Sequence, residues 1–234
     1  MLSFQIANYK NGLGTTNGPL IQIPYIVTPI AIPVVNSGQP ISSTITPQTT
    51  PNEAHSIALD DDLCGIFSGR MTNWNQVINP ETGSAYPNAA PITVVYRIDG
   101  SGTTELLMRH LTAVCTTGNT ARGVTFIDSQ TFTDSFGGTA PAGFVGAIGS
   151  KGVRAVLTSA STAAVAYLSP DYTNTFLAPS SSAVSSAGAA QLRVASLKNT
   201  ANGVYYAPSF SNATLAIGTT APSDNRTGLG QPTE

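Results

Sequence analysis

The feature that most constrains the fold of this 234-residue chain is a strand that runs through a glycine turn into a helix. Ile92–Arg97 is rich in β-branched residues and predicts a strand. The turn Asp99–Gly102 contains two glycines, and Leu107, Leu111 and Val114 then recur at the spacing of one helix face. Strands that alternate with helices favour an α/β fold whose sheet is at least partly parallel. We therefore expect an α/β domain built around this unit.

Other segments add helices and strands to this unit. Helices are expected at three further places: Ala58–Phe67, Gly152–Thr158 and Ser209–Ile217. Ala163–Leu168 predicts a strand, and Pro19–Val35 predicts extended runs whose prolines favour edge or crossover strands. The segment Thr72–Asn75 predicts a short capped turn with a buried tryptophan. Polar, glycine-containing composition predicts a loop at Tyr9–Asn17.

Composition and charge exclude several functional classes. The 12 acidic and 10 basic residues nearly balance and form no basic run, which argues against a nucleic-acid partner. Only 9% of residues are charged, against roughly 25% in an average soluble domain. The longest apolar stretch, Ile21–Val35, is interrupted by three prolines, so no membrane insertion is expected. Met1–Phe4 lacks the basic start and apolar core of a signal peptide.

The two cysteines, Cys64 and Cys115, leave two alternatives open. They are either two buried thiols or a disulfide closing a loop of about 50 residues, worth about 3–4 kcal/mol. Export from the cytoplasm would favour the disulfide. Metal binding is not expected, because His55 and His110 are the only histidines and no Cys-x-x-Cys spacing occurs.

The glycine turn carries the residues with a chemical role. A helix that opens directly after it presents N–H groups without internal acceptors, and its dipole favours an anion. Ser101 and Thr103 can add hydroxyls, Gly102 permits close backbone approach, and Arg97 supplies a planar fork that Asp99 can hold in place. The alternative is an ordinary turn without a ligand. These residues by themselves indicate an oxyanion site without deciding between phosphate, sulfate and a carboxylate.

Several segments resemble known families. Tyr96–Thr104 resembles the signature of periplasmic phosphate-binding proteins of the PstS type. Other segments are similar, in the same order, to their secreted relatives, the DING proteins: Gly18–Pro24, Leu63–Arg70, Thr72–Trp74, Thr103–Leu106, Cys115 and Tyr167–Tyr172. The resemblance covers the chain from about Gly18 to the region of Ile217. Several motifs in order are a far stronger signal than the glycine turn alone.

The resemblance implies a periplasmic-binding-protein-like lobe of the type II, Venus-flytrap class, with a mixed sheet flanked by helices. Such proteins clamp phosphate between two lobes. By motif match, the phosphate ligands would be Arg97, Ser101, Gly102 and Thr103. Asp99 and Gly100 would support these ligands, and Cys64 would form a disulfide with Cys115.

The chain departs from the family pattern in its first lobe. Family members carry a Thr-Leu-Pro type loop, a Ser-bearing turn and an Asp that accepts the phosphate proton, and none is found before Gly18. No return into the first lobe is found towards Glu234. We therefore expect residues 1–33 to be a remnant of the first lobe with crossover strands and residues 34–205 to be the second lobe. Residues 206–234 would form a C-terminal helix and a turn-rich tail.

The resulting functional hypothesis is a non-enzymatic, periplasmic or extracellular protein that binds inorganic phosphate and needs no cofactor. An ABC transporter, or self-association that completes the clamp, would be its partner. The alternative is an extracellular structural or surface-assembly protein that reuses the same lobe. Phosphatase activity is the weakest hypothesis, because no nucleophile motif or metal set is visible in the sequence.

Overall fold

The computed structural model describes residues 3–17, 29–35, 60–79, 84–87, 89–160, 163–170, 173, 192, 194–198, 202, 204–206, 208 and 210–217. The chain divides into two compact units, Thr28–Ala213 and Met1–Val27 together with Thr214–Glu234. The extended run predicted before residue 29 and the first two residues of the helix predicted at Ala58–Phe67 lie outside the described residues.

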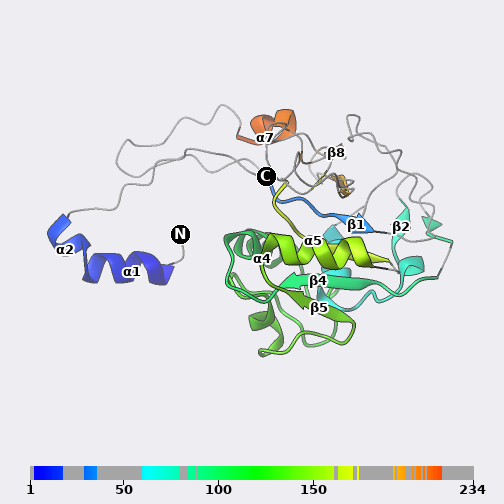
Figure 1. The fold of residues 1–234 in the computed structure, drawn as a ribbon, viewed down its shortest axis with the longest axis horizontal. Coiled ribbons are helices and arrows are strands. Elements are labelled where there is room, and N and C mark those ends of the chain that lie inside the picture. Colours follow the sequence, from blue (N-terminus) through cyan, green and yellow to red (C-terminus); the bar gives the residue numbers. More distant parts are fainter. Residues whose placement is uncertain are drawn as a thin grey trace. The chain divides into compact units, whose positions relative to one another are not determined.

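The larger unit is built on a four-stranded mixed sheet (Figure 1). In spatial order its strands are β1 (Val34–Val35), β6 (Ala164–Ala166), β4 (Thr93–Arg97) and β5 (Phe144–Ala147). β4 is parallel to both of its neighbours, so Val95 lies opposite Val145 on one side and Ala166 on the other. β1 pairs antiparallel with β6 at the edge, the position that the prolines before it predict. The α/β prediction with a mixed sheet is confirmed.

Helices cover both faces of this sheet because its strands are apolar on both sides. The helices are α3 (Asp60–Ser68), α4 (Gly102–Val114) and α5 (Gly149–Ser159). Val94 belongs to a core that includes Ile66 of α3 and Leu107 of α4, whereas its neighbour Val95 packs with Leu157 of α5. Successive residues of a strand face opposite sides, so α3 and α4 cover one face and α5 the other. Figure 1 shows α5 running beside β4, against which it packs.

Aromatic rings fill the core on the α4 side. Phe132, the first residue of the 3-10 helix η2 (Phe132–Phe136), is fully buried. Its ring centroid lies 5.0 to 6.4 Å from those of five other aromatic residues: Phe67, Tyr96, Phe136, Phe144 and Tyr167. Such ring pairs contribute about 0.5–1.5 kcal/mol each beyond their buried area. Phe132 therefore ties α3, β4, β5 and the end of β6 together.

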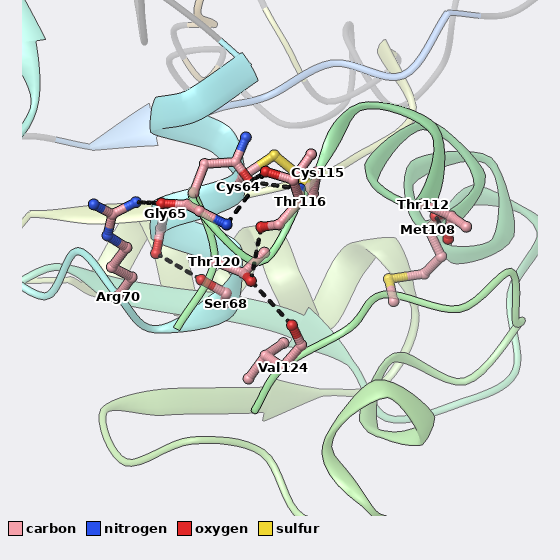
Figure 2. Close-up of a disulfide and its surroundings, with 12 residues drawn as sticks. Cys64, Gly65, Ser68, Arg70, Met108, Thr112, Cys115, Thr116, Thr120 and Val124 are labelled. Atoms are coloured by element: carbon pink, nitrogen blue, oxygen red, sulfur yellow. Dashed lines mark hydrogen bonds between the residues drawn. A yellow bond between two sulfur atoms is a disulfide. The ribbon is translucent and has the colours of Figure 1, made fainter. Parts of the chain in front are cut away.

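The disulfide that the resemblance implies is present between Cys64 and Cys115 (Figure 2). It joins the middle of α3 to the residue that caps the C-terminus of α4, across a sequence separation of 51. Next to it, the Thr120 hydroxyl lies 3.0 Å from the carbonyl oxygens of both Thr116 and Val124. The disulfide and this loop fix the C-terminal end of α4.

The predicted capped turn is the 3-10 helix η1 (Trp74–Gln76). Asn73 and Gln76 form a reciprocal capping box, and Trp74 is fully buried with its ring 5.3 Å from that of Tyr86. Short antiparallel pairs complete the described strands: β2 (Ile78–Asn79) with β3 (Ser84–Ala85), and β7 (Leu197–Lys198) with β8 (Tyr205–Tyr206). The last described helix is α7 (Phe210–Ile217), as the sequence predicts.

The prediction of a loop at Tyr9–Asn17 is wrong. α1 (Ser3–Asn11) continues into this segment, and α2 (Gly14–Asn17) follows it. The Thr15 hydroxyl donates to the Gly12 carbonyl and the Asn17 side chain to that of Leu13, at 2.7 and 3.0 Å. The polar composition of this segment suggested a loop, but its polar side chains donate to backbone carbonyls within the helical turns. No helix in the described part of the chain is long and apolar enough to cross a membrane.

Candidate anion-binding site

Two helices begin at the same edge of the sheet. Because β4 and β5 are parallel neighbours, both end at one edge, where α4 begins after β4 and α5 after β5. In open α/β sheets, ligands bind beyond the carboxyl ends of the strands. Arg97 is the last residue of β4, and Ser101, Gly102 and Thr103 form the start of α4. The residues predicted to bind an anion therefore lie where this class of fold places ligands.

The start of α4 is capped but still offers an N–H donor. Ser101 is the N-cap, and its side-chain oxygen accepts the Thr103 N–H at 3.2 Å. The Ser101 N–H donates to the Gln130 carbonyl at 3.0 Å. Within the described residues, the N–H groups of Gly102 and Thr104 have no acceptor. Gly102 is exposed, so its N–H is available to an anion at the positive end of the α4 dipole, whereas Thr104 is fully buried.

Arg97 is held beside this helix start by Asp99. The Arg97 Nε donates to Asp99 Oδ1 at 2.7 Å, and Nη2 donates to Oδ2. Asp99 Oδ1 also accepts the N–H of Gly149, the first residue of α5, at 2.9 Å. The Arg97 side chain is 13% exposed, so its position is defined by these contacts rather than by solvent.

These contacts set the charge states of the pair. The hydrogen bond from Arg97, followed by that from Gly149, holds the pKa of Asp99 well below its usual range. The hydrogen bond to Asp99 raises the pKa of Arg97. A permanent carboxylate therefore occupies the N-terminus of α5 and neutralises the guanidinium, while Glu105, the carboxylate in the first turn of α4, is paired with Arg109.

Tyr167 and Thr104 lie beneath the site. The Tyr167 hydroxyl accepts the Arg97 N–H at 3.0 Å and shares a 2.9 Å hydrogen bond with the Thr104 hydroxyl. Both residues are buried, and burial raises the pKa of Tyr167 to about 12, so the phenol is neutral at ordinary pH. Sequence reasoning named Tyr167 only as part of a family motif and gave neither residue a role.

The fold itself does not require glycine at two positions of the turn, Gly100 and Gly102. A Cβ added at Gly100 or Gly102 would meet nothing within 4 Å, and neither residue has a positive φ. Gly149 differs, because its φ of 63° favours glycine. Open space beside Gly102 leaves room for a ligand to approach the backbone closely.

The described residues contain no group of three or more His, Cys, Asp or Glu side chains that could hold a metal ion. His55 lies outside the described residues.

Comparison with known proteins places the chain in a family. A profile described as a PBP superfamily domain matches residues 4–220. The chain belongs to the PBP superfamily. "Alkaline phosphatase L" of Pseudomonas aeruginosa (strain UCBPP-PA14) is 37% identical to it over 214 residues, which cover 92% of this chain and 45% of that protein. A "Phosphate-binding protein" of an unknown prokaryotic organism is 38% identical over 173 residues, covering 72% of this chain and 39% of that protein.

A solved structure gives the same result for the fold. The high-affinity periplasmic phosphate-binding protein PfluDING, bound with phosphate, matches with a TM-score of 0.66 and 33% identity. The match covers 95% of this chain and 52% of that one. The predicted resemblance to phosphate-binding and DING proteins is confirmed. The chain spans about half the length of the relatives that it matches.

Proposed function

We propose that this chain binds inorganic phosphate at the N-terminus of α4. The observation that carries the proposal is the combination of the exposed, unpartnered Gly102 N–H at the start of α4 with an arginine held at the end of β4. The names of two relatives, a "Phosphate-binding protein" and the phosphate-bound PfluDING, support phosphate over other oxyanions.

The proposed ligands are Arg97, Ser101, Gly102 and Thr103. Arg97 uses Nε and one Nη2 hydrogen on Asp99, which leaves Nη1 and the second Nη2 hydrogen for phosphate oxygens. Ser101 accepts the Thr103 N–H through its side-chain oxygen, so its own hydroxyl hydrogen stays available as a donor. The donor proposed for Thr103 is its hydroxyl, because its N–H serves the cap. The Gly102 N–H completes the set.

The proposed setting is outside the cytoplasm, with phosphate as the ligand and no cofactor. The disulfide is typical of oxidising compartments, and the relative PfluDING is periplasmic. Because this chain spans about half the length of its relatives, we expect a phosphate Kd weaker than micromolar for the chain alone. An ABC transporter, or a second copy of the chain completing the clamp, is the proposed partner.

Calorimetric titration of phosphate and of sulfate into the purified chain tests this function. We expect binding that prefers phosphate and is lost in Arg97→Ala. Arg122→Ala is the matched control, because Arg122 is exposed and lies in the loop at the opposite, C-terminal end of α4. No heat at millimolar phosphate, or equal binding by Arg97→Ala, would contradict the proposal.

Two alternatives have their own readouts. The name of the Pseudomonas aeruginosa relative raises phosphoester hydrolysis, so each variant is also incubated with p-nitrophenyl phosphate. Steady release of nitrophenolate that is lost in Arg97→Ala would favour a phosphatase over a binding protein.

A structural, surface-assembly role predicts self-association that size-exclusion chromatography detects. A monomer at every concentration tested would count against that role.

A further inference from the structure

We propose that Tyr167 is the positioning residue of this site, because its hydroxyl sets the distance between Arg97 and the N-terminus of α4. The inference rests on the proposed function and goes beyond its four ligands. Tyr167 does not touch the anion in this proposal. It acts through the backbone of Arg97 and the side chain of Thr104.

One hydroxyl connects the two halves of the site. The Arg97 N–H donates to the Tyr167 oxygen at 3.0 Å, which fixes the end of β4. The same oxygen lies 2.9 Å from the Thr104 hydroxyl, which fixes the first turn of α4. Thr104 is fully buried, two residues after Gly102, which carries the exposed N–H donor. Displacement of either contact would therefore move the arginine relative to the helix donors.

The hydroxyl is itself held in place by its surroundings. Tyr167 is 1% exposed and follows β6 directly, next to β4 in the sheet. Its ring lies 6.1 Å from those of Phe67 and Phe132, one in edge contact and the other stacked. A buried ring with two aromatic neighbours has little freedom to rotate or shift. The position of the hydroxyl is thus determined by the core rather than by the ligand.

Removal of the hydroxyl leaves buried polar groups without partners. In Tyr167→Phe the ring packing stays, but the Arg97 N–H loses its acceptor and the Thr104 hydroxyl loses its partner. Buried groups of this kind move to find water or another acceptor. The separation between arginine and helix start would then vary, and binding that depends on both would weaken.

The experiment is a phosphate titration of the whole chain followed by ¹H–¹⁵N NMR, which reports a Kd even in the millimolar range. In the unmodified protein we expect the Gly102 and Thr104 amide signals to shift with phosphate. Tyr167→Phe and Thr104→Val should each raise the Kd about tenfold, and the double variant should raise it little further, because Tyr167→Phe already removes the contact that Thr104→Val removes. Thr104→Ser keeps the hydroxyl and should recover most of the affinity that Thr104→Val loses.

A stability control separates positioning from folding. Trp74→Leu removes ring packing against Tyr86 and leaves the ring neighbours of Tyr167 in place, so we expect a lower Tm and an unchanged Kd. Tyr167→Phe also loses stability, because it leaves the Arg97 N–H unpartnered, but it should raise the Kd even though its Tm is no lower than that of Trp74→Leu. If the unmodified protein gives no phosphate shifts, the proposed function fails and this inference with it. If it binds and Tyr167→Phe binds equally well, or if Kd simply follows Tm across the variants, only the positioning role is overturned.

Discussion

Replacement of Asp99 by asparagine tests the electrostatic description of the site. The Asp99 carboxylate accepts from Arg97 Nε, from Arg97 Nη2 and from the Gly149 N–H. In Asp99→Asn one oxygen remains, while the other position becomes an NH₂ donor that faces the Arg97 Nη2 donor. The arginine keeps its charge but loses its fixed orientation, so phosphate affinity should fall about tenfold.

The expected stability change follows from burial. A hydrogen bond to a charged group contributes about 1.5–3 kcal/mol when fully buried. The Asp99 side chain is 35% exposed, so we expect about 1 kcal/mol for the lost contact after solvent screening. In a unit of this size that corresponds to a decrease in Tm of about 2–4 °C at neutral pH.

The pH dependence gives a signed test. Because the pKa of Asp99 is lowered in the folded state, the unfolded chain takes up this proton first as the pH falls. The contribution of Asp99 is therefore fully present above roughly pH 5 and is lost progressively below the unfolded pKa of about 4. The Tm difference between the two proteins should be constant from pH 8 to 5 and should shrink towards pH 2.

Thermal unfolding followed by circular dichroism, with phosphate titrations at pH 7, measures both effects. Asp128→Asn is the control, because Asp128 is 38% exposed and pairs with Arg109 at 3.4 Å outside the site. That variant changes the charge equally and should shift the Tm by less than about 1 °C without altering phosphate affinity. An Asp99→Asn protein as stable as the original at pH 7, or a Tm difference that grows on acidification, would refute the reasoning.

Three other changes have defined outcomes. Gly102→Ala should leave the Tm within about 1 °C, since the added Cβ meets nothing, but should weaken phosphate binding at least tenfold. Gly123→Ala is the control, at a glycine with a φ of 80°. An equal loss of phosphate affinity in Gly123→Ala would contradict the prediction. Removal of the disulfide by Cys64→Ala with Cys115→Ala should lower the free energy of unfolding, measured by urea denaturation, by about 4 kcal/mol. An unchanged free energy of unfolding would argue that loop-closure entropy is not the source of stabilisation. Phe132→Ala should cost about 4 kcal/mol in the same assay, and a loss below about 1 kcal/mol would show that the ring cluster is not a packed core.

The sequence predicts the parts of the fold that depend on local signals. The strand ending at Arg97, the helix after Ser101 and the capped turn around Trp74 are all encoded within a few residues, by β-branched runs, an N-cap and a capping box. β5 was not predicted, since Phe144–Ala147 is a short run that contains a glycine and is stabilised by pairing with β4 about 50 residues earlier.

In the site too, contacts between residues close in sequence can be predicted, whereas contacts between distant segments cannot. Arg97 and Asp99 are two residues apart, so their contact can be anticipated from the turn. Tyr167 lies 70 residues from Arg97 and 63 from Thr104 along the chain, and only the order of strands in the sheet brings them together. No local pattern carries that information, although the family motif containing Tyr167 marks it as a residue to inspect.

The pairing of Arg97 with Asp99 also bears on how quickly an anion could reach the site. The guanidinium is balanced by its own carboxylate, and the chain has a formal net charge of −2. Such a surface gives an approaching anion little long-range attraction, so encounters depend on unassisted diffusion. Discrimination then begins only at contact, through hydrogen-bond donors. The association rate of phosphate would accordingly change little with ionic strength, unlike that of sites with unpaired cations, which slow as salt is added.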